Sequence, residues 1–149
     1  MNDGKLIDFL LVEDDDDHAE LCIRSLRRSR LVNTIERVSD GEQAMDYLRG
    51  EGMFSRRQMP EVILLDLKLP KKNGLEVLKE IREDPALSHL LVVILTTSAE
   101  LSDRESAYEH HVNSYLVKPV ESENFRKMIS DLSLYWGIWN QPPPSNRKG

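Results

Sequence analysis

The sequence predicts an α/β fold, a doubly wound five-stranded parallel sheet in a single domain. Short apolar runs alternate five times with segments whose apolar residues recur at helical spacing. This alternation is typical of a parallel sheet with helices on both faces. The 149 residues provide enough chain for one sizeable core. The chain has no internal repeat and no long linker, so we expect one folded unit.

Five apolar runs are the expected strands. The clearest runs from Val62 to Leu65, just after Pro60, and indicates a strand buried on both faces. The second run is short and more polar, which favours an edge of the sheet. In chain order the expected strands cover residues 6–12, 34–38, 62–65, 90–95 and 113–117.

The first helix is expected directly after five consecutive acids that follow the first strand. Ala19, Cys22 and Leu26 fall on one face of this helix, which indicates the side turned to the core. Asp16 or Asp17 is expected to cap its amino end, where acidic side chains also suit the helix dipole.

The later helices carry similar boundary signals. Ser39-Asp40-Gly41 forms a turn that caps the second helix, and Asn73-Gly74 opens the third, which ends before Pro85. The segment from Ser102 to Glu105 fits a capping box for the fourth. The last helix is expected from about Ser122.

The composition indicates a soluble protein of a reducing compartment. The net charge of −6 argues against nucleic acid as a partner. Cys22 is the single cysteine, so an internal disulfide framework is excluded. No apolar run is long enough to span a membrane, and the amino terminus lacks the features of a signal peptide. We expect a cytoplasmic protein, with His18 and the other histidines at its surface.

Four of the expected strands end in a chemically useful group. These groups are Glu13 and Asp14, Asp66, Thr96 and Lys118. The carboxyl ends of parallel strands lie along one edge of the sheet, so the groups converge if the strand order is 2-1-3-4-5. The acids of the first and third strands then face each other across the crevice at the switch point.

The chemistry of this edge favours a metal ion and a phosphoryl group. Two carboxylates 4 Å apart repel each other by about 4 kcal/mol at an effective dielectric constant near 20, and a hard divalent cation such as magnesium relieves that repulsion. A lysine and a hydroxyl nearby indicate an additional anionic ligand. Asp66 is then a candidate nucleophile that forms an aspartyl phosphate.

The motifs LLVED, LLDLKLPKKNG, VILTTS and YLVKP together resemble the response-regulator receiver domain of two-component signalling. The resemblance covers about residues 6–134 and implies a flavodoxin-like fold. It also implies that Asp66 accepts a phosphoryl group from a sensor histidine kinase. Glu13, Asp14, Asp66 and the backbone carbonyl of Lys68 would hold Mg²⁺.

The same resemblance assigns the remaining site residues. Thr96 corresponds to the hydroxyl that bonds the phosphoryl group, and Lys118 to the lysine that pairs with it. Pro119 is expected to follow a cis peptide bond. Tyr115 corresponds to an aromatic residue whose rotamer changes on phosphorylation, although a plain core role is equally compatible with the sequence.

A finer resemblance, to the stand-alone response regulators of cyanobacterial phytochromes, comes from the loop Glu51–Met59 and from the ending WGIWNQPPP. It implies a phytochrome as the kinase and a homodimer through the region of the last helix. The alternative is that Trp136 and Trp139 fold back into the core. We expect the domain to span residues 1–140, followed by a flexible Pro-rich tail over 141–149.

Three other functions fit parts of the sequence less well. A flavin-binding redox carrier would need a phosphate-cradling loop where the acids stand. An aspartyl phosphatase usually has a second acid two residues after its nucleophile, where this chain has Lys68. A degenerate receiver that only binds partners would lack the intact set of acid, hydroxyl and lysine. The sequence therefore favours a phospho-accepting switch over an enzyme.

Overall fold

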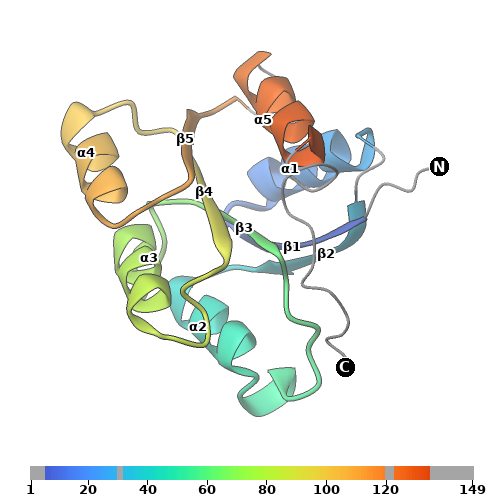
Figure 1. The fold of residues 1–149 in the computed structure, drawn as a ribbon, viewed down its shortest axis with the longest axis vertical. Helices are drawn as coiled ribbons and strands as arrows, with labels where there is room; N and C mark the ends of the chain where they lie inside the picture. The colour runs from blue at the N-terminus through green and yellow to red at the C-terminus, as the bar shows by residue number, and fades with distance from the viewer. Residues whose placement is uncertain (1–5, 30–31, 120–122, 135–149) are drawn as a thin grey trace.

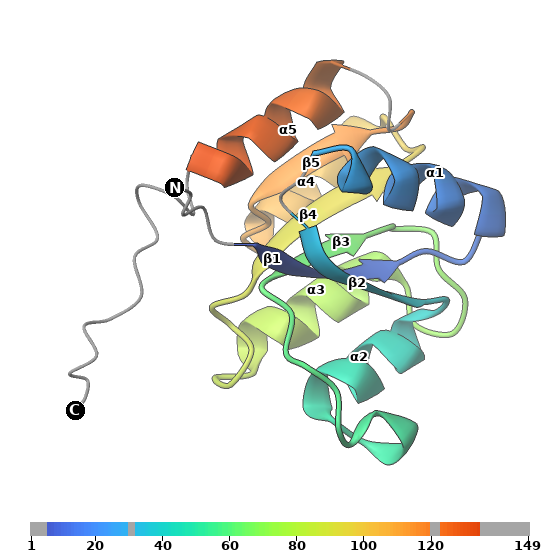
Figure 2. The same cartoon turned by 90° about the vertical axis from the view of Figure 1, so that its right-hand side faces the viewer.

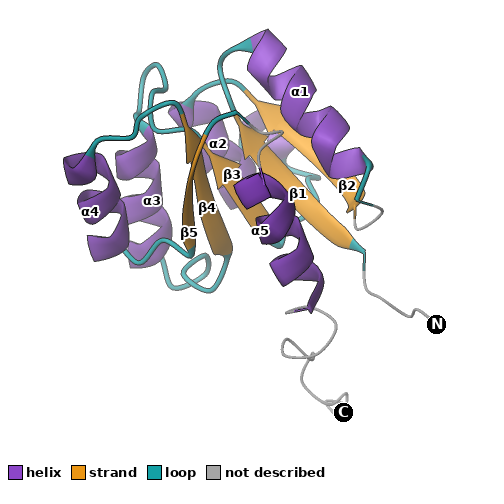
Figure 3. Cartoon of the chain, turned by 90° about the horizontal axis from the view of Figure 1, so that it is seen from above, coloured by secondary structure: helices purple, strands orange, loops and turns teal. Residues whose placement is uncertain are grey.

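The computed structural model describes residues 6–29, 32–119 and 123–134, in which strands and helices alternate (Figures 1 and 3). The strands are β1 Ile7–Val12, β2 Val32–Val38, β3 Val62–Leu65, β4 Leu91–Thr96 and β5 Ser114–Val117. All neighbouring strands are parallel, and their order is β2-β1-β3-β4-β5. The predicted fold class and strand order are confirmed.

The helices cover both faces of the sheet. They are α1 Asp16–Arg27, α2 Gly41–Arg49, α3 Gly74–Glu83, α4 Leu101–Glu109 and α5 Glu123–Leu134, with a short 3-10 helix η1 at Gly52–Phe54. In Figure 2, α1 and α5 lie on one side of the sheet and α2 and α3 on the other. Within the described ranges, no helix is long and apolar enough to cross a membrane.

Alternate residues of each central strand enter two separate cores. Phe9, Leu11 and Leu64 pack with α1 and α5, whereas Leu10 and Leu65 pack with α2, α3 and α4 on the opposite face. This alternation follows from the two-residue period of a strand. Both sets are almost fully buried, which explains why the central strands are continuous apolar runs.

Cys22 belongs to the core beneath α1, as predicted. Burial raises the pKa of its thiol to about 12, because a thiolate would be poorly solvated there. Cys22 is therefore an unreactive packing residue in the folded protein.

Several boundaries differ from the sequence predictions, and the expected ends of β1, β4 and β5 are each within one residue of those observed. The N-cap of α1 is Asp15 rather than Asp16 or Asp17, and its side chain accepts a hydrogen bond from the backbone of His18. The α4 capping box does not form, because α4 begins at Leu101 and its N-cap Glu100 makes no side-chain cap bond. The strand β2 begins two residues before the expected Thr34, since it pairs with the whole of β1.

The loop after α2 is tied back to the helix that precedes it. The guanidinium of Arg57 donates hydrogen bonds to the carbonyls of Tyr47 and Leu48, at the open end of α2. The rings of Tyr47 and Phe54 meet edge to face at 5.3 Å. The longer loop 51–59 is thus an ordered extension of the α2 layer.

Candidate functional site

Strand register brings the candidate residues to one edge of the sheet. Val12 pairs with Leu65 in the register of β1 and β3, so the residues that follow them leave the sheet side by side. Backbone bonds continue just beyond the strands, from Asp66 N to the Val12 carbonyl at 3.1 Å and from Lys118 N to the Thr96 carbonyl at 2.8 Å. The backbone hydrogen bonds of the sheet therefore fix the backbone positions of Asp66 and Lys118.

Asp66 lies where β3 passes into the tightly packed loop that leads to α3. Its side chain is almost fully buried, and Oδ1 accepts a hydrogen bond from the backbone N–H of Lys68 at 3.2 Å. The loop folds back against its own start, where Gly74 N donates a hydrogen bond to the Leu67 carbonyl at 3.0 Å. A Cβ on Gly74 would lie 2.2 Å from the Asp66 carbonyl oxygen, so only glycine fits there.

Three carboxylates gather at this edge. Oxygens of Glu13, Asp14 and Asp66 lie within 4.8 Å of one another, with Glu13 and Asp66 buried and Asp14 exposed. Glu13 Oε2 accepts a hydrogen bond from the backbone N–H of Asp15 at 3.1 Å. Burial raises the pKa of the Glu13 carboxyl above its usual range, although the hydrogen bond from Lys118 opposes this shift.

Lys118 reaches from the end of β5 into the same group. Its Nζ lies 2.6 Å from Glu13 Oε1, 3.3 Å from Asp66 Oδ2 and 2.8 Å from Nδ1 of His18. The lysine side chain is only 8% exposed, so these contacts replace its hydration. Three carboxylates and one ammonium leave a net charge of −2, which a divalent cation would balance.

The prediction that His18 is a surface residue is wrong. The ring is half-buried and contacts Lys118, which lies 100 positions further along the chain. A sequence signal existed, because His18 precedes the core residue Cys22 by four positions and therefore shares its helix face. Helical side chains also lean toward the amino end of the helix, which here points at the strand ends.

Thr96 and Tyr115 lie on neighbouring strands next to this group. Thr96 Oγ1 accepts a hydrogen bond from Ser98 N at 3.3 Å, and Tyr115 Oη donates to the Ser98 carbonyl at 3.0 Å. Both residues are buried. Ser98 Oγ also donates to Asp103 at 2.6 Å. Ser98, in the loop between β4 and α4, is thus hydrogen-bonded to Thr96 of β4, to Tyr115 of β5 and to Asp103 of α4.

Tyr115 is buried in this structure, with the guanidinium of Arg104 5.4 Å from its ring centroid. Burial raises the pKa of its hydroxyl group. The peptide bond between Lys118 and Pro119 is cis, as predicted.

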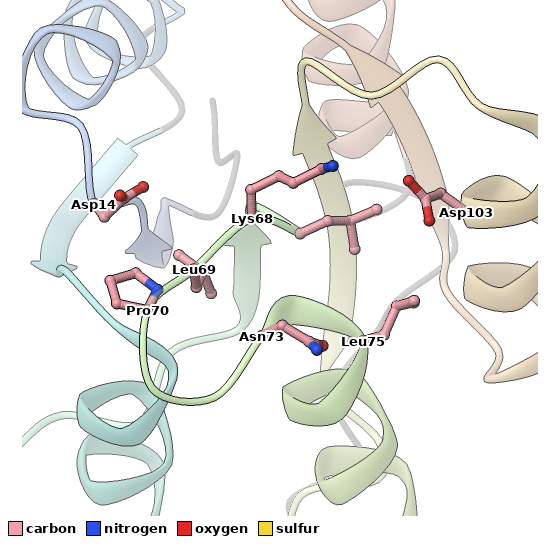
Figure 4. Close-up of a pocket in the computed structure, with 8 residues that line it drawn as sticks. Asp14, Lys68, Leu69, Pro70, Asn73, Leu75 and Asp103 are labelled. Atoms are coloured by element: carbon pink, nitrogen blue, oxygen red, sulfur yellow. The ribbon is translucent and has the colours of Figure 1, made fainter.

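A pocket of about 510 Å³ opens beside the carboxylates (Figure 4). In Figure 4, Asp14 and Asp103 lie on opposite sides of this pocket, and Lys68 lies between them. Much of its wall is apolar, formed by Leu67, Leu69, Pro70 and Leu75. A ligand can therefore approach the acid group from solvent on the side of Asp14.

Proteins of similar sequence include several named regulators. The chain is 44% identical over 135 residues to the probable methanogenesis regulatory protein FilR2 of Methanothrix harundinacea, covering 90% of this chain and 86% of FilR2. It is 39% identical over 127 residues to the response regulator Rcp1 of Synechocystis sp., covering 85% and 86% of the two chains.

Solved structures resemble the fold along nearly the whole chain. The bacteriophytochrome response regulator RtBRR is 50% identical with a TM-score of 0.78, over 96% of this chain and 87% of RtBRR. The phosphorylated cyanobacterial phytochrome response regulator RcpA is 36% identical with a TM-score of 0.79, over 93% and 99% of the two chains. The Mn(2+)-bound form of Rcp1 is 36% identical with a TM-score of 0.76, over 92% and 99%.

The family model of the response regulator receiver domain matches residues 9–130. This match contains β2 to β5 and α1 to α4 in full, β1 from Phe9 onward and most of α5. It also includes each of the residues that converge at the carboxyl edge of the sheet. The chain therefore belongs to the response regulator receiver domain family of two-component signalling.

Proposed function

We propose that Asp66 is the phospho-acceptor of this response regulator. The observation that carries the proposal is the position of its carboxylate, buried at the end of β3 and 3.3 Å from the ammonium of Lys118. In the proposed step, a carboxylate oxygen of Asp66 bonds to phosphorus as the bond from phosphorus to a kinase histidine breaks. The electron pair returns to that nitrogen, and the kinase histidine, whose other ring nitrogen already carries a proton, leaves as neutral imidazole.

Lys118 and Thr96 complete the proposed site. The ammonium of Lys118 would pair with the phosphoryl oxygens, whose charge exceeds that of a carboxylate. The Thr96 hydroxyl, which accepts a hydrogen bond from Ser98 N, would donate its own proton to the same group. Tyr115 would change rotamer in response, since it is hydrogen-bonded to the loop that carries Ser98.

We propose Mg²⁺ as the resident ion, held by Glu13, Asp14, Asp66 and the backbone carbonyl of Lys68. The fit rests on the oxygen donor set, which suits a hard cation, and on the net charge of −2. The Mn(2+)-bound form of Rcp1 supports a divalent ion in a relative. A bound cation would offset negative charge on the transferring phosphoryl group.

Mass spectrometry of the intact protein tests the assignment. Acetyl phosphate with magnesium should add one phosphoryl group, and a chelator should prevent this. Asp66→Asn should abolish the adduct, whereas Asp17→Asn, which alters an exposed acid outside the carboxylate group, should retain it. An adduct that persists in Asp66→Asn would place the acceptor elsewhere.

We further propose that the kinase is a phytochrome and that the protein is a cytoplasmic switch, with autophosphatase activity at most. The likeness to RtBRR and RcpA supports the kinase. A purified bacteriophytochrome kinase, prelabelled with phosphate, should transfer its label to this protein within minutes and leave the Asp66→Asn variant unlabelled. Transfer no faster than from an unrelated histidine kinase would refute the phytochrome assignment.

We also propose a homodimer through α4, β5 and α5. In α4, Leu101 and Tyr108 are 66% and 50% exposed, and exposed apolar side chains on one helix favour an interface. Trp136 and Trp139, which the sequence linked to this interface, lie outside the described residues, as does the tail 141–149. Sedimentation velocity tests the proposal. Leu101→Glu should shift the full chain toward monomer, whereas Met53→Glu, on η1, should not; a monomeric wild type at high micromolar concentration would refute it.

A further inference from the structure

The side chain of His18 contacts the ammonium group at the centre of the site. His18 is the third residue of α1, and its backbone N–H is fixed by the Asp15 cap at 3.0 Å. From there the ring reaches Lys118, with Nδ1 2.8 Å from Nζ. The contact joins the first turn of α1 to the end of β5, so it depends on the assembled fold.

The contact with Lys118 determines which ring nitrogen of His18 carries the proton. A lysine ammonium has three protons and no lone pair, so every close polar atom around it must accept. Within the part of the chain that the structure describes, the close neighbours of Lys118 Nζ are Glu13 Oε1, Asp66 Oδ2 and His18 Nδ1. His18 must therefore be neutral in this arrangement, with its own proton on Nε2. The ring supplies the third acceptor.

His110 provides a contrast within the same chain. Its Nδ1 lies 2.9 Å from the Ser106 carbonyl oxygen, which can only accept. Nδ1 of His110 therefore carries a proton. His18 and His110 therefore differ in which ring nitrogen carries the proton, and this difference can be measured without phosphorylating the protein.

We propose that His18 is a positioning residue for Lys118 in phosphoryl transfer, an inference that rests on the function proposed above. A neutral acceptor holds the ammonium without adding negative charge, so the group keeps its net charge of −2 and its capacity for a divalent cation. Among the described residues, the loss of His18 leaves the ammonium with the two carboxylates of Glu13 and Asp66 as partners. It would then be drawn toward Glu13 and held less favourably for the incoming phosphoryl group.

Two substitutions at His18 distinguish the effect of losing the hydrogen-bond acceptor from the effect of losing the volume of the ring. His18→Leu fills similar space without an acceptor, whereas the side-chain oxygen of His18→Asn replaces Nδ1. A hydrogen bond to a charged group is worth enough to change a rate about tenfold. With acetyl phosphate at saturating magnesium, we expect His18→Leu to phosphorylate about tenfold more slowly and His18→Asn to recover most of the lost rate.

The control is His89→Leu, which removes an exposed imidazole at the opposite end of β4 and should leave the rate unchanged. Urea unfolding of each variant verifies that it is folded. A wild-type rate in folded His18→Leu would overturn the inference, as would a loss of rate in His18→Asn as large as that in His18→Leu.

The second measurement is the ring nitrogen spectrum of the unmodified protein. Two-dimensional ¹H–¹⁵N correlation at neutral pH should show the Nε2–H form for His18 and a protonated Nδ1 for His110. A protonated Nδ1 on His18 would overturn the inference even if His18→Leu were unable to fold. If the wild type forms no adduct at Asp66, the proposed function fails, while the spectrum still tests the contact between His18 and Lys118.

Discussion

Gly74→Ala should slow phosphorylation by displacing the backbone of Asp66, the proposed phospho-acceptor. The added Cβ would lie 2.2 Å from the carbonyl oxygen of Asp66 and 2.7 Å from the Cα of Leu67. Both neighbours are backbone atoms, so a side-chain rotation cannot relieve the contact. Either the start of α3 or the exit of β3 must move.

The size of this movement follows from the contact distance. Ordinary van der Waals contact begins at 3.4 Å, so the gap must open by about 1.2 Å. Overpacking of this kind costs about 1–3 kcal/mol of stability. A displacement near 1 Å at a reacting group can slow a reaction about 100-fold, and we expect a fall of between about 10-fold and 100-fold in the rate with acetyl phosphate.

Gly52→Ala is the matched control. Gly52 has a positive φ of 60°, and none of the described residues comes within 4 Å of the added Cβ. The left-handed backbone costs an alanine about 1–2 kcal/mol, a loss of stability similar to that expected for Gly74→Ala. Urea unfolding and phosphorylation kinetics on both variants separate stability from alignment. Equal phosphorylation rates in the two would refute the argument that Gly74 positions Asp66.

Two further predictions concern stability. Arg82→Ala should lower the free energy of unfolding in urea by about 2–4 kcal/mol, because the guanidinium donates hydrogen bonds to the carbonyls of His111, Ser88 and Leu90 and to the side chain of Asn113. The control is Arg24→Ala, which breaks an exposed ion pair and should lower it by less than about 0.5 kcal/mol. Similar losses of stability in the two variants would contradict this prediction. Burial raises the pKa of Glu13 above its ordinary value of 4.5, so the folded state binds that proton more tightly and the metal-free protein loses stability as pH rises through the folded pKa. Glu13→Gln should therefore raise the melting temperature of metal-free protein at pH 7, with a difference that shrinks below pH 4.5; a lower melting temperature at pH 7 would show that the bond to Lys118 outweighs burial.

The sheet could be predicted because its signals are local. Buried parallel strands require continuous apolar runs, and Val62 to Leu65 is such a run. The position of Asp66 at a strand end then followed from the general rule that open α/β sheets place ligand sites at their carboxyl edge. The family motifs lie at these strand ends, which is why the candidate residues converge as expected.

Two kinds of feature could not be predicted from the sequence. One is the choice among chemically equivalent neighbouring residues, and the other is a contact between residues far apart in the chain. Five successive acids can each cap a helix, and the turn after β1 decides that Asp15 does so. Arg82 resembles a solvated residue of an amphipathic helix, but its partners His111 and Asn113 lie 29 and 31 positions away. His18 was missed for the same reason, since its partner Lys118 approaches only when β5 joins the sheet.

Lys118 links the charge of the site to the arrangement of the strands. Its ammonium is shared between Glu13 and Asp66, while its backbone N–H donates to Thr96 on the neighbouring strand. A phosphoryl group on Asp66 would replace one negative charge by about two. In the proposed mechanism, Lys118 then moves toward Asp66 and weakens its contact with Glu13. Thr96 and Tyr115 both bond the loop at Ser98, so a Thr96 hydroxyl that turns to donate to the phosphoryl group would carry the change to that loop. In this proposal, the phosphoryl group competes directly with Glu13 for the ammonium of Lys118.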